Sequence, residues 1–357
     1  MATMEELMQK AIQQSTAQKK PSELTHWKPD EPWQQSCYAW DAEAEIWEII
    51  KTTPASSSAA VDKATSSKIT SIALYSWNID FMLPCAEARM SAALAHLEEL
   101  TSRLPSTTAI VIGLQEMTPS DLITISHQPW VRNKLYLTDV DSSAWGSGMY
   151  GTTTLVDRRL EVASCFRVHY AATRMERDAL FVDVTAPAIS PKVIRFSNSH
   201  LESLALDPPL RPTQMQVAAK YLHGGGEKEE QLAGAVIAGD FNAIQPFDAN
   251  LHTENGLEDA CLELGCASVY DNAGATWGQQ AHPAARERFG LSRMDKAFFC
   301  GSGIKLQAFE RIGADVVVGD DKPEQKDKLL QLGFEKAWVT DHLGIKVTFG
   351  LVQDTRL

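Results

Sequence analysis

The sequence predicts a layered α/β fold, and three observations support this prediction. The chain has 357 residues, of which 44% are hydrophobic and 22% charged, a balance typical of folded globular proteins. From Ile69 onward, short runs rich in β-branched residues alternate with stretches of helical spacing. No repeat of fixed short period interrupts this alternation. Many strands with helices between them favour a domain in which sheets and helices form separate layers.

The expected elements follow one another closely along this part of the chain. Residues 69–77 predict a strand, and residues 88–104 predict a helix with Met90, Leu94 and Leu97 on one side. Further strands are expected at residues 108–116, 150–157, 179–185, 193–201, 234–240, 294–301 and 344–350. A helix with a glycine stop is expected over residues 211–226, and a short helix closed by Gly265 over residues 256–265.

The residues before Ile69 have a different character. Residues 1–51 form an arm that carries Trp27, Trp33, Trp40 and Trp47, and prolines within it argue against a continuous helix. Residues 4–13 are compatible with a short amphipathic helix. Residues 52–68 are rich in Ser, Ala and Thr and predict a flexible linker, so residues 69–357 would form the main, catalytic domain. The tryptophans either pack on this domain as a strap or bind a protein partner.

Charge and hydropathy narrow the classes of partner. The chain has 33 Lys and Arg against 46 Asp and Glu, and its net charge of −13 argues against coating nucleic acid by bulk electrostatics. A bound metal ion can still supply local positive charge. No run of about 18 apolar residues is present, so we expect no membrane span. The N-terminal residues lack the apolar core of a secretory signal.

The cysteine pattern and the lack of a secretory signal predict the cellular compartment of the protein. The six cysteines are scattered, without a CxxC pair. They favour free thiols in a reducing compartment, with disulfides as the alternative. We therefore expect an intracellular protein, in the nucleus, the cytoplasm or both.

Polar side chains of a similar kind recur where the expected strands begin or end. These residues are Asn78, Glu116, His200, Asp240 with Asn242, Asp295, and Asp341 with His342. Taken alone, the segment "VIAGDFNAI" around Asp240 is compatible with a plain Asx turn. The repetition at separate strand ends instead predicts a common rim at which the strands converge on one site.

The residue types at this rim indicate phosphoryl chemistry. Carboxylates and amides without cysteine suit a hard cation such as Mg²⁺, or Mn²⁺, whereas zinc would require clustered His and Cys ligands. A metal draws charge from phosphate oxygens, a carboxylate positions water, and imidazolium groups meet the developing negative charge. On this hypothesis Asp240 orients or deprotonates the attacking water, and Asn242 holds the phosphate or that water.

The segments "SWNID", "GLQE", "SHLES", "GDFN", "RMDKAFF" and "TDH" occur in this order. From Ile69 to Phe349 the chain resembles the endonuclease/exonuclease/phosphatase superfamily, and within it the 5′-tyrosyl-DNA phosphodiesterase branch. The resemblance implies a four-layer α/β/β/α sandwich with two central mixed sheets. It also implies Mg²⁺-dependent cleavage of the bond between a tyrosine and a DNA 5′-phosphate, a DNA repair reaction.

The resemblance assigns a role to each residue of the rim. Glu116 and Asp341 would ligate Mg²⁺ with Asn78 beside them, while Asp240 and Asn242 would handle the water. His200 and His342 would stabilise the transition state, and Asp295 would orient His342. Ser203 would contact the phosphate, and Trp277 would line the substrate groove.

Three positions differ from that branch. Phe81 follows "WNID", where the branch has glycine, and Leu204-Ala205 and Ala243-Ile244-Gln245 stand where it has DNA-holding arginines. Other arginines that could compensate are Arg174, Arg177, Arg286, Arg288 and Arg293. A phosphohydrolase for a small phosphorylated metabolite or another phosphodiester therefore remains an alternative. A non-catalytic binding module of the same fold is a further one.

Overall fold

The computed structural model describes residues 26–50, 68–225, 231–266 and 274–352. The helix expected over residues 4–13 and nearly all of the linker expected over residues 52–68 lie outside this range. Within it, no helix has the length and hydrophobicity needed to cross a bilayer.

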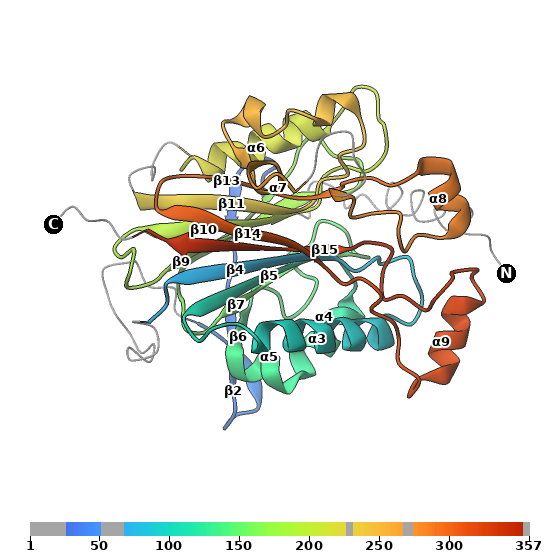
Figure 1. The fold of residues 1–357 in the computed structure, drawn as a ribbon. Helices are drawn as coiled ribbons and strands as arrows, with labels where there is room; N and C mark the ends of the chain where they lie inside the picture. Colours follow the sequence, from blue (N-terminus) through green and yellow to red (C-terminus); the bar gives the residue numbers. More distant parts are fainter. Residues whose placement is uncertain (1–25, 51–67, 226–230, 267–273, 353–357) are drawn as a thin grey trace.

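Two mixed sheets lie face to face in the middle of the molecule (Figure 1). The eight-stranded sheet has the order β14 (Ile304–Ile312), β15 (Gly344–Leu351), β4 (Ser71–Asn78), β5 (Thr108–Met117), β7 (Gly151–Asp157), β6 (Leu135–Leu137), β2 (Tyr38–Asp41) and β3 (Ile46–Ile49). The seven-stranded sheet has the order β1 (Pro32–Gln34), β8 (Glu161–His169), β9 (Asp178–Thr185), β10 (Val193–Ser199), β11 (Leu232–Asp240), β13 (Asp295–Cys300) and β12 (Glu258–Asp259).

Helices cover the outer faces of both sheets, which confirms the predicted four-layer α/β/β/α sandwich (Figure 1). One outer layer contains α3 (Ala86–Ser102), α4 (Pro119–His127) and α5 (Pro129–Lys134). The other contains α6 (Arg211–Leu222) and α7 (Ala260–Glu263). Two further helices, α8 (Pro283–Phe289) and α9 (Pro323–Leu330), lie at one end of the sandwich.

Strand β4 shows why the sequence produces layers. Successive side chains of a strand point to opposite faces. Ile72 and Leu74 therefore join the core between the two sheets, whereas Ala73, Tyr75 and Trp77 pack in the core beneath α3. Because both faces are covered, every residue of β4 is buried and the strand is a nearly continuous apolar run.

The parallel strand pairs explain the position of the polar rim. β4 pairs in parallel with β5 in one sheet, and β10 pairs in parallel with β11 in the other. Parallel strands end at the same edge of a sheet. The ends of these four strands carry Asn78, Glu116, His200 and Asp240, which therefore meet at one end of the sandwich.

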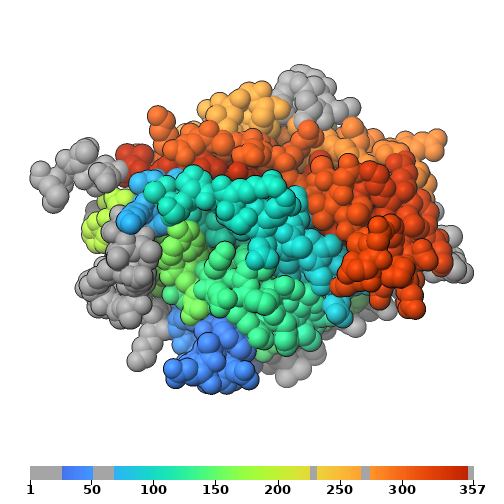
Figure 2. Space-filling view, turned by 60° about the horizontal axis from the view of Figure 1, so that its bottom comes forward, coloured from blue at the N-terminus to red at the C-terminus, as the bar shows by residue number. Residues whose placement is uncertain are grey.

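The described part of the arm pairs with both sheets. β1 lies antiparallel to β8, and the β2–β3 hairpin extends the other sheet beyond β6. Trp27 stacks on His169 with ring centroids 3.9 Å apart, and the Arg132 guanidinium lies 3.8 Å from the centre of the Trp40 ring. Figure 2 shows the blue hairpin at the edge of the molecule, against the green segment that follows α4. Residues 26–50 thus pack on the main body.

The predicted strands agree with the structure to within about two residues. The short strands β1, β2, β3, β6 and β12 were not predicted, and neither were the longer strands β8 and β14. Both strands contain a register shift, between Val162 and Ser164 in β8 and between Leu306 and Ala308 in β14. A shift of this kind interrupts the alternation of side chains from which a strand is predicted. The helix expected over residues 256–265 is shorter than predicted, because Glu258–Asp259 pairs with β13 as β12.

The expectation of six free thiols is wrong for one pair of cysteines. Cys261 and Cys266 form a disulfide, with Cα atoms 5.3 Å apart. The chain turns back after α7 through Gly265, whose φ of +63° is in the left-handed region, and this brings the two residues together. Cys37, Cys85, Cys165 and Cys300 are free.

Candidate functional site

A cavity of about 530 Å³ opens beside the strand ends that form the rim. This volume is in the range that holds a small ligand. Most of the predicted site residues line it, namely Glu116, Ser203, Asp240, Asn242, Trp277, Asp341 and His342. The other three do not line the cavity but contact residues that do. Asn78 and His200 contact Asp240, and Asp295 contacts His342. The structure therefore brings all the predicted site residues together.

The Asp240 carboxylate is at the centre of the site and is almost completely buried. Its Oδ2 accepts a hydrogen bond from Asn78 Nδ2 at 3.0 Å and lies 3.4 Å from His200 Nε2 and 3.7 Å from His342 Nε2. Its Oδ1 accepts from the backbone N–H of Asn242 at 2.8 Å. Oδ1 thus forms an Asx turn with the backbone, and Oδ2 faces the side chains of Asn78, His200 and His342.

The backbone around the site adopts conformations that are uncommon for residues other than glycine. Asp80, Glu116 and Asn242 have φ values of +57°, +56° and +47°. Gly239 has a φ of +156°, and a Cβ there would lie 1.7 Å from the Ser199 carbonyl oxygen. Only glycine therefore lets β11 approach β10 closely enough to place Asp240. Such backbone conformations concentrate at functional sites, where the surrounding structure holds them.

Glu116 and Asp341 supply carboxylate oxygens on the cavity wall. Glu116 Oε2 accepts from the backbone N–H of Phe81 at 3.0 Å, and Asp341 Oδ2 accepts from Trp277 Nε1 at 2.7 Å. Burial raises the pKa of Glu116 above its ordinary value. Burial, together with Asp341 and Glu116, also raises the pKa of Asp80 to about 8. Buried carboxylates that raise one another's pKa in this way form a set of oxygen donors that fits a hard divalent cation.

Asp240, Asp295 and His342 also approach one another, with potential ligand atoms within 4.8 Å. We do not favour a cation between these three residues. Asp295 is completely buried, and its Oδ2 lies 2.9 Å from His342 Nδ1 in a charge-assisted hydrogen bond that a cation would have to replace. The side chains of Glu116 and Asp341 instead retain 12% and 22% exposure. A cation entering from the cavity would meet these two first.

The surroundings of the two histidines of the site shift their pKa values in opposite directions. Burial alone would lower the pKa of His342, but Asp295 and Asp240 raise that pKa well above its ordinary value. For His200, burial, Arg177 and His342 all lower the pKa well below its ordinary value. Arg177 Nη1 lies 2.6 Å from His200 Nδ1 and can only donate, so that nitrogen carries no proton. The lowered pKa and the Arg177 contact favour a neutral His200, whereas two imidazolium groups were expected.

Arg177 and Asp80 belong to the site, although neither was predicted as a catalytic or metal-binding residue. Arg177 was named only as one of five arginines that could replace DNA-holding arginines, but it is buried and also donates to the Ser203 hydroxyl at 3.0 Å. Asp80 lines the cavity directly after the "WNI" residues. No local pattern identifies an arginine whose partners lie 23 and 26 positions away. The raised pKa of Asp80 likewise depends on its burial and on Asp341 and Glu116, which are distant in the sequence.

The other arginines proposed to compensate have different surroundings. Arg286 pairs with Glu335 and Arg293 with Asp259. Arg174 is exposed, and Arg288 lines the cavity. Among the described residues that line the cavity, Arg288 is the sole lysine or arginine.

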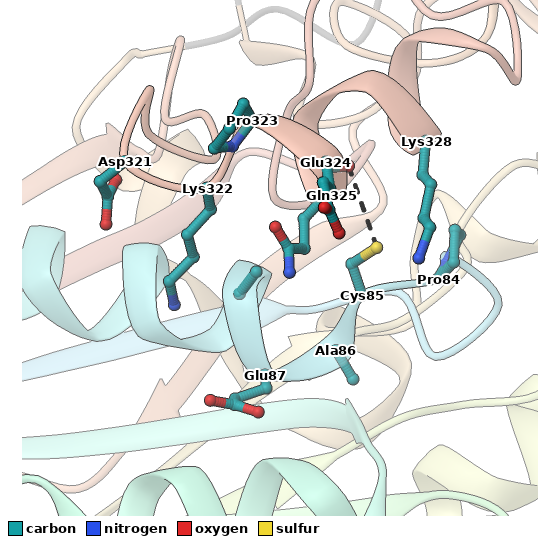
Figure 3. A pocket seen from close by; sticks show the side chains of 11 residues that line it. Pro84, Cys85, Ala86, Glu87, Asp321, Lys322, Pro323, Glu324, Gln325 and Lys328 are labelled. Atoms are coloured by element: carbon teal, nitrogen blue, oxygen red, sulfur yellow. Dashed lines mark hydrogen bonds between the residues drawn. The ribbon is translucent and has the colours of Figure 1, made fainter.

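A second cavity, of about 610 Å³, lies between the N-terminal ends of α3 and α9 (Figure 3). The Cys85 thiol approaches the Gln325 carbonyl oxygen across it at 3.9 Å. Its lining mixes Lys322 and Lys328 with acidic residues and contains none of the predicted site residues. This cavity therefore offers no comparable catalytic grouping.

Comparison with known proteins identifies the family of the chain. The sequence model of the endonuclease/exonuclease/phosphatase family matches residues 75–342, a range that includes the whole rim. No curated protein matches the chain significantly by sequence.

Several solved structures share the fold. D. rerio TDP2 complexed with single-strand DNA product is 19% identical, with a TM-score of 0.56, covering 78% of this chain and 98% of that one. Truncated Caenorhabditis elegans TDP2 is 18% identical, with a TM-score of 0.57, covering 78% and 97%. The human Nocturnin catalytic domain is 15% identical, with a TM-score of 0.53, covering 79% and 95%. The chain therefore belongs to the endonuclease/exonuclease/phosphatase family, whose members are metal-dependent phosphoesterases and nucleases.

Proposed function

We propose that the protein is a Mg²⁺-dependent phosphodiesterase, with the tyrosine–DNA 5′-phosphate bond as the first substrate to consider. The observation that carries this proposal is the arrangement around Asp240, whose Oδ2 lies within 3.7 Å of an amide and two imidazoles. The complex of D. rerio TDP2 with a single-strand DNA product supports extending the substrate class to this chain. On this proposal the protein acts in DNA repair, in the nucleus or cytoplasm.

Glu116 and Asp341, with Asn78 beside them, would hold the cation. Their oxygen donors suit Mg²⁺ and also accept Mn²⁺. When bound, the cation would withdraw charge from the phosphate oxygens. Trp277 fixes the orientation of Asp341 through its 2.7 Å hydrogen bond, which leaves Asp341 Oδ1 directed at the site.

The remaining residues act on the water and the phosphate. Asp240 orients or deprotonates the attacking water, and Asn242 holds that water or a phosphate oxygen in line. His342 is an imidazolium whose Nε2–H faces the site, so it stabilises the negative charge that develops on the phosphate. Asp295 positions this ring through Nδ1. His200 Nε2 lies 3.0 Å from the side-chain amide nitrogen of Asn242 and 3.4 Å from Asp240 Oδ2, so this ring lies against both residues that handle the water.

Ser203 and Trp277 would contact the substrate directly. Ser203 lines the cavity while its hydroxyl oxygen accepts from Arg177, so its proton is available to a phosphate oxygen. Trp277 lines the same cavity as the wall of a substrate groove. The four tryptophans of the arm do not line this cavity. We propose that the arm also binds a protein partner.

A second candidate function is hydrolysis of a small phosphoester rather than a DNA adduct. The net charge of −13 and the scarcity of cations in the cavity lining favour it. A third, non-catalytic binding, would require the same residues to hold a phosphate group without turnover.

One substrate panel separates these functions. p-Nitrophenyl phosphate, the p-nitrophenyl ester of thymidine 5′-monophosphate and a 5′-tyrosyl oligonucleotide are incubated with the protein, with and without Mg²⁺. Mg²⁺-dependent release from the tyrosyl oligonucleotide supports the first candidate, and release from the nucleotide ester alone supports the second. Absence of Mg²⁺-dependent release from all three favours the binding module.

Variants link any activity to the site. Glu116→Gln is expected to lower turnover at least about a hundredfold, the scale of losing one catalytic group. Glu98→Gln, on the exposed side of α3, makes the same chemical change away from the cavity and should leave turnover unchanged. Equal rates for the two variants would contradict the proposed role of Glu116.

A further inference from the structure

We propose that the substrate carries an apolar alkyl or aryl group next to the phosphodiester, and that this group binds an apolar lining beside the metal-binding carboxylates. The apolar lining is defined as Met82, Leu204, Ile244, Phe289, Leu291 and Met294. This inference rests on the proposed phosphodiester hydrolysis. It narrows the substrate of that same site toward the second candidate, a small phosphoester rather than a DNA adduct.

Exposure of large apolar side chains is the first observation. Leu204, Ile244 and Phe289 are 38%, 40% and 58% exposed, and all three border the same 530 Å³ cavity. Apolar surface gathered around a cavity and left open to water is characteristic of a ligand-binding groove. Binding an apolar group there would remove this surface from water.

The backbone of Leu204 is the second observation. Its φ of +71° is in the left-handed region, which is unfavourable for a bulky residue. Arg211 holds this conformation by donating from Nη1 to the carbonyl oxygens of Leu204 at 2.6 Å and Glu202 at 3.0 Å. An exposed leucine kept in a strained conformation by a buried arginine indicates a functional constraint on its position.

The same arginine also fixes the loop that carries Ile244. Arg211 pairs with Asp248 through two hydrogen bonds of 2.8 and 2.7 Å, and both side chains are buried. Asp248 Oδ2 in turn accepts from the backbone N–H of Gln245 at 2.9 Å. One buried ion pair therefore joins the loop of Leu204 to the loop of Ile244. The apolar lining is organised before any ligand binds, which lowers the ordering cost of binding.

Charge is the third observation and argues against a long polyanion. The cavity lining contains four carboxylates, Asp80, Glu116, Asp240 and Asp341. Arg288, the one arginine among the described lining residues, has its guanidinium 5.0 Å from the centre of the Phe289 ring. Strong binding of a nucleic acid strand depends on several cations that contact successive phosphates. Beyond the phosphate that reacts, this lining favours an uncharged apolar group.

A homologous series of p-nitrophenyl alkyl phosphodiesters tests the inference. The methyl, butyl and hexyl esters share one leaving group, so the bonds that change are the same in each. The oxygen of water bonds to phosphorus while the bond to p-nitrophenolate breaks, and an alkyl phosphate remains. With Mg²⁺ present, kcat/KM should rise by roughly fourfold for each methylene that the apolar lining buries.

Variants and a polyanionic substrate sharpen the test. Ile244→Gln and Leu204→Gln should reduce the ratio of kcat/KM between hexyl and methyl esters. Ile123→Gln, at a 60% exposed position on α4, should leave this ratio unchanged. The ratio does not depend on the fraction of folded enzyme. A decanucleotide carrying the same p-nitrophenyl ester on its 5′-phosphate should have a lower kcat/KM than the hexyl ester at physiological ionic strength.

The outcomes separate this inference from the proposed function. Two outcomes would overturn the inference and leave the phosphodiesterase function intact. In one, Mg²⁺-dependent hydrolysis does not depend on the length of the alkyl group, and in the other, the decanucleotide is strongly preferred. Absence of Mg²⁺-dependent hydrolysis for every ester would overturn the proposed function, and the inference with it. A rising series that the Ile244 and Leu204 variants flatten would support both.

Discussion

Replacing Asp295 by Asn tests the pairing that keeps His342 protonated. Asn retains the shape of Asp but removes the negative charge 2.9 Å from His342 Nδ1. A hydrogen bond between charged groups contributes about 1.5–3 kcal/mol, and 1.36 kcal/mol corresponds to one pKa unit. The pKa of His342 should therefore fall by about 1–2 units in the variant.

The sign of this change sets the expected pH dependence. The pKa of His342 is raised in the folded protein, so its contribution to the free energy of unfolding is complete below about pH 6.5 and is lost as the pH rises through the folded-state pKa. Imidazolium at this position also supports turnover. In Asp295→Asn the alkaline limb of the kcat profile should therefore move to lower pH, with a larger loss at pH 8 than at pH 6.

Two measurements check this prediction. Histidine side-chain NMR signals give the pKa of His342 directly, and kcat measured across pH gives the alkaline limb. His342→Gln serves as the control background, in which adding Asp295→Asn should not shift the profile further. An unchanged His342 pKa in Asp295→Asn, with the fold intact, would refute the pairing as the cause of the protonation state.

Three further substitutions test other parts of the structure. Asp240→Asn should lower kcat by at least about a hundredfold, because it removes the charge that orients water, and a normal rate in folded protein would contradict that role. Arg211→Met should lower the free energy of unfolding in urea by about 3–5 kcal/mol by leaving Asp248 buried without its partner, and adding Asp248→Leu should recover part of the loss. Gly239→Ala should lower the free energy of unfolding by more than about 3 kcal/mol, because its Cβ would overlap the neighbouring strand, and a wild-type melting temperature would contradict this.

The sequence contains the information for much of the fold because buried strands and their polar ends are local patterns. β4 and β11 are apolar runs that end at Asn78 and Asp240, and their boundaries could be predicted closely. β14 is an edge strand in which exposed Lys305 and Glu310 dilute the apolar pattern. The short strands of the arm depend on pairing with distant strands such as β8, so no local signal predicts them.

The grouping of these polar side chains at one end of the sandwich could be predicted, but the opposite pKa shifts of the two histidines could not. His200 directly follows β10, and His342 lies just before β15. In the sequence, both are therefore histidines at the end of a strand. Their difference arises from Arg177 behind one ring and Asp295 behind the other, and both contacts depend on tertiary structure. The burial of Arg211 between two loops, and with it the placement of Leu204, likewise follows from long-range packing.

The most direct test is a titration of the protein with Mn²⁺, which reports on the metal site independently of activity. Electron paramagnetic resonance of free Mn²⁺ should show one ion bound per chain, with affinity weakened at least about tenfold, the scale of losing one charged ligand contact, in Glu116→Gln and Asp341→Asn. Glu98→Gln should bind like the wild type. Equal Mn²⁺ affinity in the wild type and all three variants would contradict the proposal that Glu116, near the end of β5, and Asp341, just before β15, hold the cation.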